Sequence, residues 1–257
     1  MPMSKYLWCV LILFLLFSCH SSTFESFGEF SIKKLSNGVK EITDGVGRKF
    51  VLIPRGIKAP KQYTKDKIIY IPVKRVIAYS GYNVSLLRGL GVLNTLVGVT
   101  HKKDYWTIDY VKHGLENGSI IYVGESNAVD YELIKKASPE VVFTWNLADI
   151  PKLEEMGIKC IVTTTKSAMD LNTRMKFMLF LSQFFNKEEV AEEFVNKVKK
   201  TIKDINTKLK DISSKPKVIW GDIYEKRVLI EPGDSWSAQI VEIAGGDYLF
   251  SDIRGSS

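Results

Sequence analysis

Short apolar runs alternate with helical patterns through the middle of this chain, between residues 75 and 163. The apolar runs predict strands at 75–79, 96–99, 120–123, 141–144 and 160–163, and the patterns between them predict helices at 83–90, 130–137 and 149–156. The strand runs show no polar alternation, so both faces of each strand must be covered. Strands of this kind separated by helices predict a parallel sheet with helices on both faces, an α/β lobe.

Helical patterns dominate after residue 165. The second of two predicted helices runs from Asn186 to about Ile212, with an apolar stripe on one side and lysines on the other. At ~1.5 Å per residue this helix spans on the order of 40 Å, which is longer than one small lobe needs. A strand at 217–220 and a helix at 237–244 then restart the α/β pattern. The fold class is therefore α/β, with two Rossmann-like lobes joined by one long α-helix and a C-terminal lobe that is short of strands.

The N-terminus predicts export. Lys5 precedes an apolar run at 6–17, which is too short to span a bilayer but suits the core of a signal peptide. Leu16-Phe17-Ser18-Cys19 resembles a lipoprotein cleavage box, in which Cys19 becomes lipidated and anchors the mature chain outside the cytoplasmic membrane. The alternative is ordinary secretion with incidental cysteines.

The predicted domain boundaries follow from these patterns. They are a signal peptide at 1–18, a tether at 19–43, an N-terminal α/β lobe at 44–165, linking helices at 166–212 and a partial C-terminal α/β lobe at 213–257. Between residues 39 and 53 the turn residues between β-prone runs predict a hairpin or a small antiparallel edge.

The composition excludes several classes. The formal net charge is +7, but the lysines are spread out and an exported chain seldom meets nucleic acid, so no nucleic acid is expected. The excess charge suits an anionic ligand or an anionic membrane surface. Of three cysteines, Cys9 leaves with the signal peptide and Cys19 is lipidated, so Cys160 stands alone as a predicted core residue and no disulfide framework forms.

No sequence motif predicts catalysis. The three histidines have neither metal-ligand spacing nor a Cys-x-x-Cys nearby, and no dinucleotide fingerprint, Walker loop or nucleophile elbow is present. We therefore expect no metal site, no cofactor and no enzymatic activity.

Aromatic residues recur just after the predicted strands, at the edge where open α/β sheets bind ligands. Flat, rigid side chains suit a large ligand, although each ring could instead pack its own loop. The residues predicted to bind ligand are Tyr82, Tyr105, Trp106, Trp145, Tyr224 and Trp236.

The chain resembles the substrate-binding proteins of ABC importers for metal chelates, the group that captures ferric siderophores, haem or cobalamin. Four segments carry the resemblance: DGVGR (44–48), RVIA (75–78) with Asn83 and Leu86, YELI (131–134) with SPEVV (138–142), and IAGGD (243–247). It implies a periplasmic or cell-surface, lipid-anchored receptor that holds a chelate between two lobes, closes little on binding and delivers the chelate to a permease and ATPase complex. It also implies that Glu132 docks on the permease through a salt bridge.

Two alternatives remain open at this point. One is an enzyme on the same two-lobed scaffold, a chelatase or a nitrogenase-like relative, which would need ligating side chains in the cleft. The other is a truncated remnant that binds nothing, because half of its second lobe is missing.

Overall fold

A five-stranded parallel sheet forms the centre of the N-terminal lobe in the computed structural model, which describes residues 23–164, 170–211 and 213–255. Its strand order is β12-β11-β6-β7-β8, and every neighbouring pair is parallel. The strands are β6 (Val76–Ala78), β7 (Leu96–Val99), β8 (Ile121–Tyr122), β11 (Val141–Thr144) and β12 (Lys159–Val162). The predicted parallel sheet is confirmed, strand by strand.

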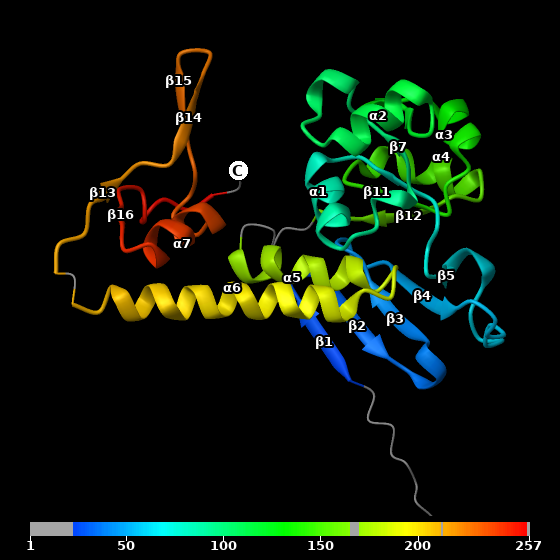
Figure 1. The fold of residues 1–257 in the computed structure, drawn as a ribbon, viewed down its shortest axis with the longest axis horizontal. Coiled ribbons are helices and arrows are strands. Elements are labelled where there is room, and N and C mark those ends of the chain that lie inside the picture. Colours follow the sequence, from blue (N-terminus) through cyan, green and yellow to red (C-terminus); the bar gives the residue numbers. More distant parts are fainter. Residues whose placement is uncertain (1–22, 165–169, 212, 256–257) are drawn as a thin grey trace, which may run out of the picture.

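Helices cover both faces of this sheet, as the unalternating strands require (Figure 1). They are α1 (Gly81–Gly89), α2 (Asp109–Asn117), α3 (Tyr131–Ala137) and α4 (Ile150–Glu155). Helices α1 and α2 contribute to one apolar cluster, whereas α3 and α4 contribute to a second one on the other face. Helix α2 was not predicted from the sequence. Two short strands, β9 (Gly124–Glu125) and β10 (Ala128–Val129), pair with each other before α3.

A second five-stranded sheet precedes the parallel sheet in the chain, and its first three strands lie in the segment 19–43 that was predicted to be a tether. It consists of β1 (Phe24–Phe27), β2 (Phe30–Lys34), β3 (Lys40–Thr43), β4 (Lys49–Pro54) and β5 (Ile68–Ile71), antiparallel except between β4 and β5. The hairpin predicted at 39–53 is confirmed as β3 and β4. The tether prediction is wrong for the described part of 19–43, because Phe27, Phe30 and Ile32 are buried in the same core as the parallel sheet.

Two consecutive helices follow the parallel sheet. Helix α5 (Leu171–Ser182) packs on β1, β2 and α1, and α6 (Glu188–Lys208) is the predicted long helix. An ion pair between Lys40 and Glu188 fixes the start of α6 to strand β3. From there α6 runs away from the N-terminal lobe and reaches the C-terminal part of the chain (Figure 1). The bridging role predicted from its length is confirmed.

The C-terminal unit is small. Strands β13 (Lys217–Val218) and β16 (Asp247–Tyr248) pair in parallel, β14 (Gly221–Tyr224) and β15 (Arg227–Ile230) form a hairpin, and α7 (Trp236–Ile243) completes it. Its apolar cluster centres on Ala238, Val241 and Tyr248. Helix α7 also contacts α5 and α6, so the unit packs against the linking helices.

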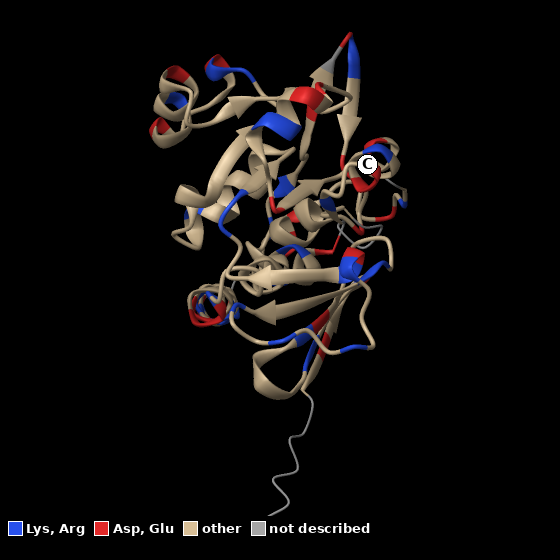
Figure 2. Cartoon of the chain, turned by 90° about the vertical axis from the view of Figure 1, so that its right-hand side faces the viewer, with Lys and Arg blue, Asp and Glu red and all other residues tan. Residues whose placement is uncertain are grey.

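Basic and acidic residues are interspersed along the ribbon (Figure 2). Within the described ranges, no helix is both long and apolar enough to cross a membrane. The predicted signal peptide and the predicted lipidation site Cys19 lie outside the described residues.

Candidate functional site

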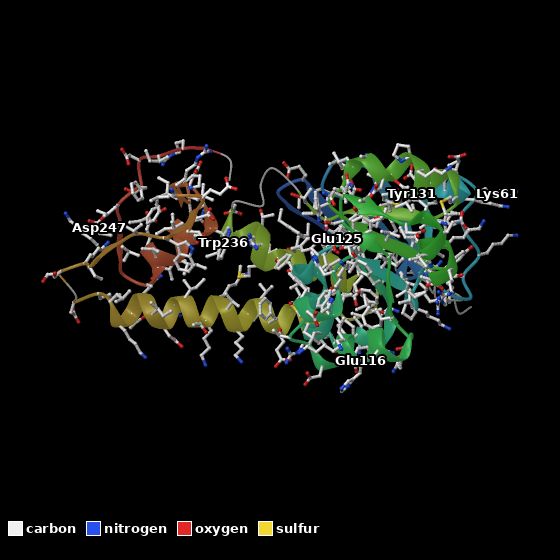
Figure 3. The ribbon with its side chains drawn as sticks, turned by 90° about the horizontal axis from the view of Figure 1, so that it is seen from above. Lys61, Glu116, Glu125, Tyr131, Trp236 and Asp247 are labelled. Carbon is white, nitrogen blue, oxygen red and sulfur yellow. The ribbon has the colours of Figure 1, made fainter. Side chains whose placement is uncertain are left out.

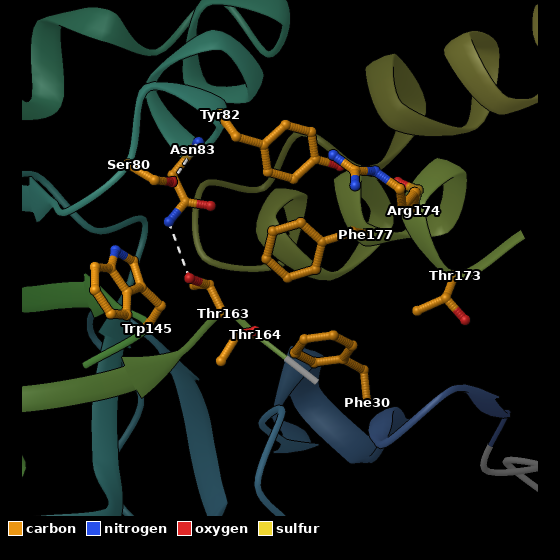
Figure 4. A pocket seen from close by; sticks show the side chains of 10 residues that line it. All are labelled: Phe30, Ser80, Tyr82, Asn83, Trp145, Thr163, Thr164, Thr173, Arg174 and Phe177. Atoms are coloured by element: carbon orange, nitrogen blue, oxygen red, sulfur yellow. Dashed lines mark hydrogen bonds between the residues drawn. The ribbon is translucent and has the colours of Figure 1, made fainter. Parts of the chain in front are cut away.

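A cavity of about 250 Å³ opens at the carboxyl ends of β6, β11 and β12 (Figure 4). Strand β6 lies between β7 and β11, and the chain leaves it first in one direction and later in the other. The cavity therefore lies at the topological switch point, where open α/β sheets bind their ligands. Its lining residues are Phe30, Ser80, Tyr82, Asn83, Trp145, Thr163, Thr164, Thr173, Arg174 and Phe177.

The start of helix α1 forms one wall of the cavity. Ser80 caps the helix by accepting a hydrogen bond from the Asn83 backbone N–H at 3.2 Å. This capped turn places the Tyr82 and Asn83 side chains directly after β6, at the edge of the sheet. The positive end of the helix dipole therefore faces the cavity from this side.

The amide of Asn83 has a defined orientation. Asn83 Nδ2 donates to Thr163 Oγ1 at 3.0 Å, and Thr163 Oγ1 in turn donates to the Thr144 carbonyl oxygen at 3.2 Å. Since the Thr163 proton is used in this way, its oxygen must accept from the amide nitrogen. Asn83 Oδ1 is then buried without a hydrogen-bond partner among the described residues.

Aromatic rings from four separate segments form the apolar walls. Phe177 on α5 stacks on Tyr82 with centroids 6.1 Å apart and an interplanar angle of 17°. Phe30 on β2 packs against Phe177 at 5.0 Å. Trp145, directly after β11, is 43% exposed and completes the lining. These rings offer flat surfaces to a ligand.

Arg174 carries the only charge among the described residues that line the cavity. Its guanidinium carbon lies 5.1 Å from the Tyr82 ring centroid and 4.4 Å from that of Trp236. Tyr82 Oη donates to the Arg174 carbonyl oxygen at 3.2 Å. Burial raises the pKa of Tyr82, and the neighbouring guanidinium opposes this shift only in part, so the phenol stays protonated.

The structure brings three of the predicted aromatic residues to this region. Tyr82 and Trp145 line the cavity, and Trp236 is joined to it through Arg174. In Figure 3, Trp236 lies on the side of the C-terminal unit that faces the rest of the molecule.

The other predicted residues lie elsewhere. Tyr105 stacks on His101 with centroids 3.9 Å apart and does not line the cavity. Trp106 is only 3% exposed and donates its Nε1–H to the His101 carbonyl oxygen, so its ring belongs to the core. Tyr224 ends strand β14, but its side chain lies outside what the structure describes. Glu132 is exposed in the first turn of α3, away from the cavity.

Sequence reasoning missed the polar and apolar residues that complete the cavity. Asn83 and Thr163 follow strand ends, so their position was a usable signal, whereas nothing local marks Phe30, Arg174 or Phe177 as cavity residues. Within the described ranges, no group of three or more His, Cys, Asp or Glu side chains could hold a metal ion.

A family model described as periplasmic binding protein matches residues 76–257. An uncharacterized lipoprotein of Methanocaldococcus jannaschii is 27% identical over 232 residues, which cover 84% of this chain and 56% of that relative. The chain thus spans little more than half the length of this curated relative.

Solved structures share the fold. A petrobactin-binding protein from Bacillus subtilis superposes with a TM-score of 0.61 at 12% identity, over 84% of this chain and 69% of that one. A periplasmic vitamin B12 binding protein of Vibrio cholerae gives a TM-score of 0.51 at 17% identity, over 72% of this chain and 69% of that one.

Proposed function

Since the chain belongs to the periplasmic binding protein family, we propose that it captures an iron siderophore or a related metal chelate and delivers it to an ABC permease and ATPase complex. In this proposal the protein is a receptor and not an enzyme. The described part of the chain offers an aromatic cavity but no group of side chains suited to binding a bare metal ion. The metal would therefore arrive already held by its chelator.

One observation carries the proposal: the aromatic cavity lies where the lobe, the linking helices and the C-terminal unit meet. Its lining comes from β2, from the loops after β6, β11 and β12, and from α5, and Trp236 of α7 packs on one of its residues. A pocket between such units is a usual place for a small-molecule site. The fold neighbours described as petrobactin-binding and vitamin B12 binding proteins support a chelate as the ligand class.

Tryptophan fluorescence tests the proposal directly. The protein is titrated with ferric siderophores, haem and cobalamin, and at least one of them should change the emission saturably. Trp145 and Trp220 are both 43% exposed, but only Trp145 lines the cavity. Trp145→Phe should therefore remove most of the signal change, while Trp220→Phe should keep it. The absence of a saturable change with every chelate would contradict the proposal.

The anchor and the location are part of the same proposal. We infer that lipidation at Cys19 holds the protein at the outer side of the cytoplasmic membrane, in the periplasm or at the cell surface. The Methanocaldococcus relative is itself described as a lipoprotein, which supports the anchor. Labelling of cells with a radioactive fatty acid should mark the wild-type chain but not Cys19→Ser. Equal labelling of both chains would refute the anchor.

Glu132 is the proposed permease contact. It is exposed on α3, and no interaction of its carboxylate with another described residue is recorded, which leaves it available to an arginine of the permease. Glu132→Lys should reduce stimulation of the reconstituted transporter ATPase without changing chelate affinity. Glu116→Lys is the control, because Glu116 is also exposed on a helix but pairs with Lys103 at 3.1 Å. Equal loss in both variants would argue against a docking role.

A further inference from the structure

We propose that the cavity selects an anionic chelate, binding an oxyanion through Arg174 and a hydrogen-bond donor through Asn83. This inference rests on the proposed function and specifies its ligand class. Neutral and cationic chelates are then poor ligands. Three independent features of the cavity support this selection: an uncompensated positive charge, an unpartnered buried acceptor and a restricted volume.

The positive charge of Arg174 has no counter-charge in the described residues. Its guanidinium lies over two aromatic rings, Tyr82 and Trp236, and interacts with the Tyr82 hydroxyl, but it forms no ion pair with any described residue. The nearest carboxylate along the chain, Asp170, accepts from the Thr173 backbone N–H at 2.8 Å and from its hydroxyl at 2.9 Å, and so caps α5. A guanidinium carries five N–H donors, more than its contact with the Tyr82 hydroxyl uses, and these donors match carboxylates and similar oxyanions.

The N-terminus of α1 adds a positive electrostatic field to that of Arg174. The helix has nine residues, and Ser80 at its N-cap and Asn83 in its first turn both line the cavity. Partial positive charge at a helix N-terminus favours anions. No Asp or Glu is among the described lining residues, so nothing in the cavity wall offsets this field.

The buried oxygen of Asn83 sets a second requirement on the ligand, which is a hydrogen-bond donor. Asn83 is only 1% exposed, and its Oδ1 has no hydrogen-bond partner in the part of the chain that the structure describes, while the Thr163 and Thr144 hydrogen bonds hold the amide in place. In Figure 4 this oxygen points into the space beside the Tyr82 and Phe177 rings. Leaving a buried acceptor unpaired costs about 1–3 kcal/mol, so a ligand that supplies an N–H or O–H donor there gains affinity.

The volume of the cavity limits the size of the group that it can hold. About 250 Å³ is below the roughly 300–1,000 Å³ of most small-molecule sites, so the cavity holds one compact arm of a chelate rather than the whole ligand. The Tyr82, Phe177 and Phe30 rings favour a flat group. A hydroxylated aromatic acid combines a flat ring, an anionic group for Arg174 and a hydrogen-bond donor for Asn83.

Small metal-free probes test the site itself by calorimetry. meta-Hydroxybenzoate carries the ring, the carboxylate and the donor, meta-hydroxybenzamide lacks the charge, and benzoate lacks the donor. We expect meta-hydroxybenzoate to bind about tenfold or more tightly than either of the others, since each loses one recognised group. Equal affinities for the acid and the amide would overturn the inference, and equal affinities for the acid and benzoate would overturn the role of Asn83.

Two variants test whether Arg174 causes the preference for the charged acid over the neutral amide. Arg174→Gln should abolish the preference for the acid over the amide, whereas Lys176→Gln should retain it, because Lys176 lies on the same helix but pairs with Glu25 outside the cavity. Melting curves check that both variants fold. A preference that survives Arg174→Gln in the folded protein overturns the inference.

A matched pair of ferric chelates separates this inference from the proposed function. Ferrioxamine B is cationic through its terminal amine, and its N-succinyl derivative is anionic around the same iron centre. Arg174-dependent binding of the anionic form alone supports the inference. Equal binding of both forms overturns it and leaves the receptor function standing. Binding of meta-hydroxybenzoate without binding of any chelate retains the anion site and refutes the receptor function.

Discussion

The guanidinium of Arg174 packs over the Trp236 ring, with its carbon 4.4 Å from the ring centroid. This contact joins the linking helix α5 to the C-terminal unit, and Tyr82 on the other lobe lies 5.1 Å from the same guanidinium. A hydrogen bond from the Leu171 N–H to Gln239 Oε1, 3.1 Å long, supports the same junction. The cavity is thus built where the C-terminal unit contacts a residue that lines it.

Replacement of Trp236 by Leu should loosen this junction. Cation–π pairs contribute about 0.5–2 kcal/mol depending on their exposure. A double-mutant cycle with Arg174→Gln, followed by urea unfolding, should therefore give a coupling free energy in this range. The corresponding cycle with Trp220→Leu should give a value near zero, since Trp220 contacts Trp236 but makes no recorded contact with Arg174. A zero coupling for Trp236 would show that the stacking does not stabilise the junction.

Replacement of Asp44 by Ala should be strongly destabilising. Its carboxylate is fully buried and accepts from Arg48 Nη2 at 2.8 Å and from the Val162 N–H at 3.1 Å, which connects the β3–β4 turn to β12. Removing one partner of a buried ion pair costs about 3–5 kcal/mol. The exposed Asp66→Ala should cost less than about 1 kcal/mol, although Asp66 pairs with Lys67. Similar losses in urea unfolding for both variants would contradict this assignment.

Two glycines of the same turn make a matched comparison. A Cβ at Gly45 would lie 1.9 Å from the Thr164 carbonyl oxygen, whereas a Cβ at Gly47 would meet nothing within 4 Å, although Gly47 has a φ of +82°. Gly47→Ala should therefore cost about 1 kcal/mol from backbone strain alone. Gly45→Ala should cost more and should also weaken ligand binding, because Thr164 lines the cavity. Unfolding curves and fluorescence titrations measure the two effects.

Cys160 should make stability fall at alkaline pH. Burial raises the pKa of its thiol from 9.0 to about 12, and the nearby Arg48 opposes this shift only in part. Above pH 9 the unfolded chain loses this proton while the folded chain keeps it, so the free energy of unfolding decreases as pH rises, by at most about 1.4 kcal/mol per pH unit. Cys160→Ala should show a shallower slope between pH 9 and 10 in urea unfolding. Buried tyrosines contribute a parallel effect in both proteins. Identical slopes would contradict the assignment.

Local patterns were sufficient for the parallel sheet and the long helix. Strands without polar alternation, such as Val141–Thr144, cannot be stable with an exposed face, and the stripe on α6 has the period of a helix. Trp145 and Tyr82 were predicted as ligand residues because strand ends in such sheets meet at one edge. Their place in one cavity agrees with that reasoning, and their binding role stays a prediction.

The sheet at the N-terminus illustrates where local patterns fail. Phe30 and Ile32 occur among polar residues, and the alternation over β2 is too short to separate a strand from a tether by sequence. Their burial depends on α5, whose Phe177 packs on Phe30 at 5.0 Å although 147 positions separate them along the chain.

The sequence by itself determined the α/β class, the positions of the central strands along the chain and the long connecting helix, because these depend on side-chain periodicity within a few turns or strands. Only the tertiary structure decided that Phe30, Asn83, Thr163 and Arg174 share one cavity, and that Trp106 is excluded from it. The reason is physical: the burial of Asn83 and the packing of Arg174 against two rings arise from contacts between distant segments. Such contacts leave no periodic signal in the chain.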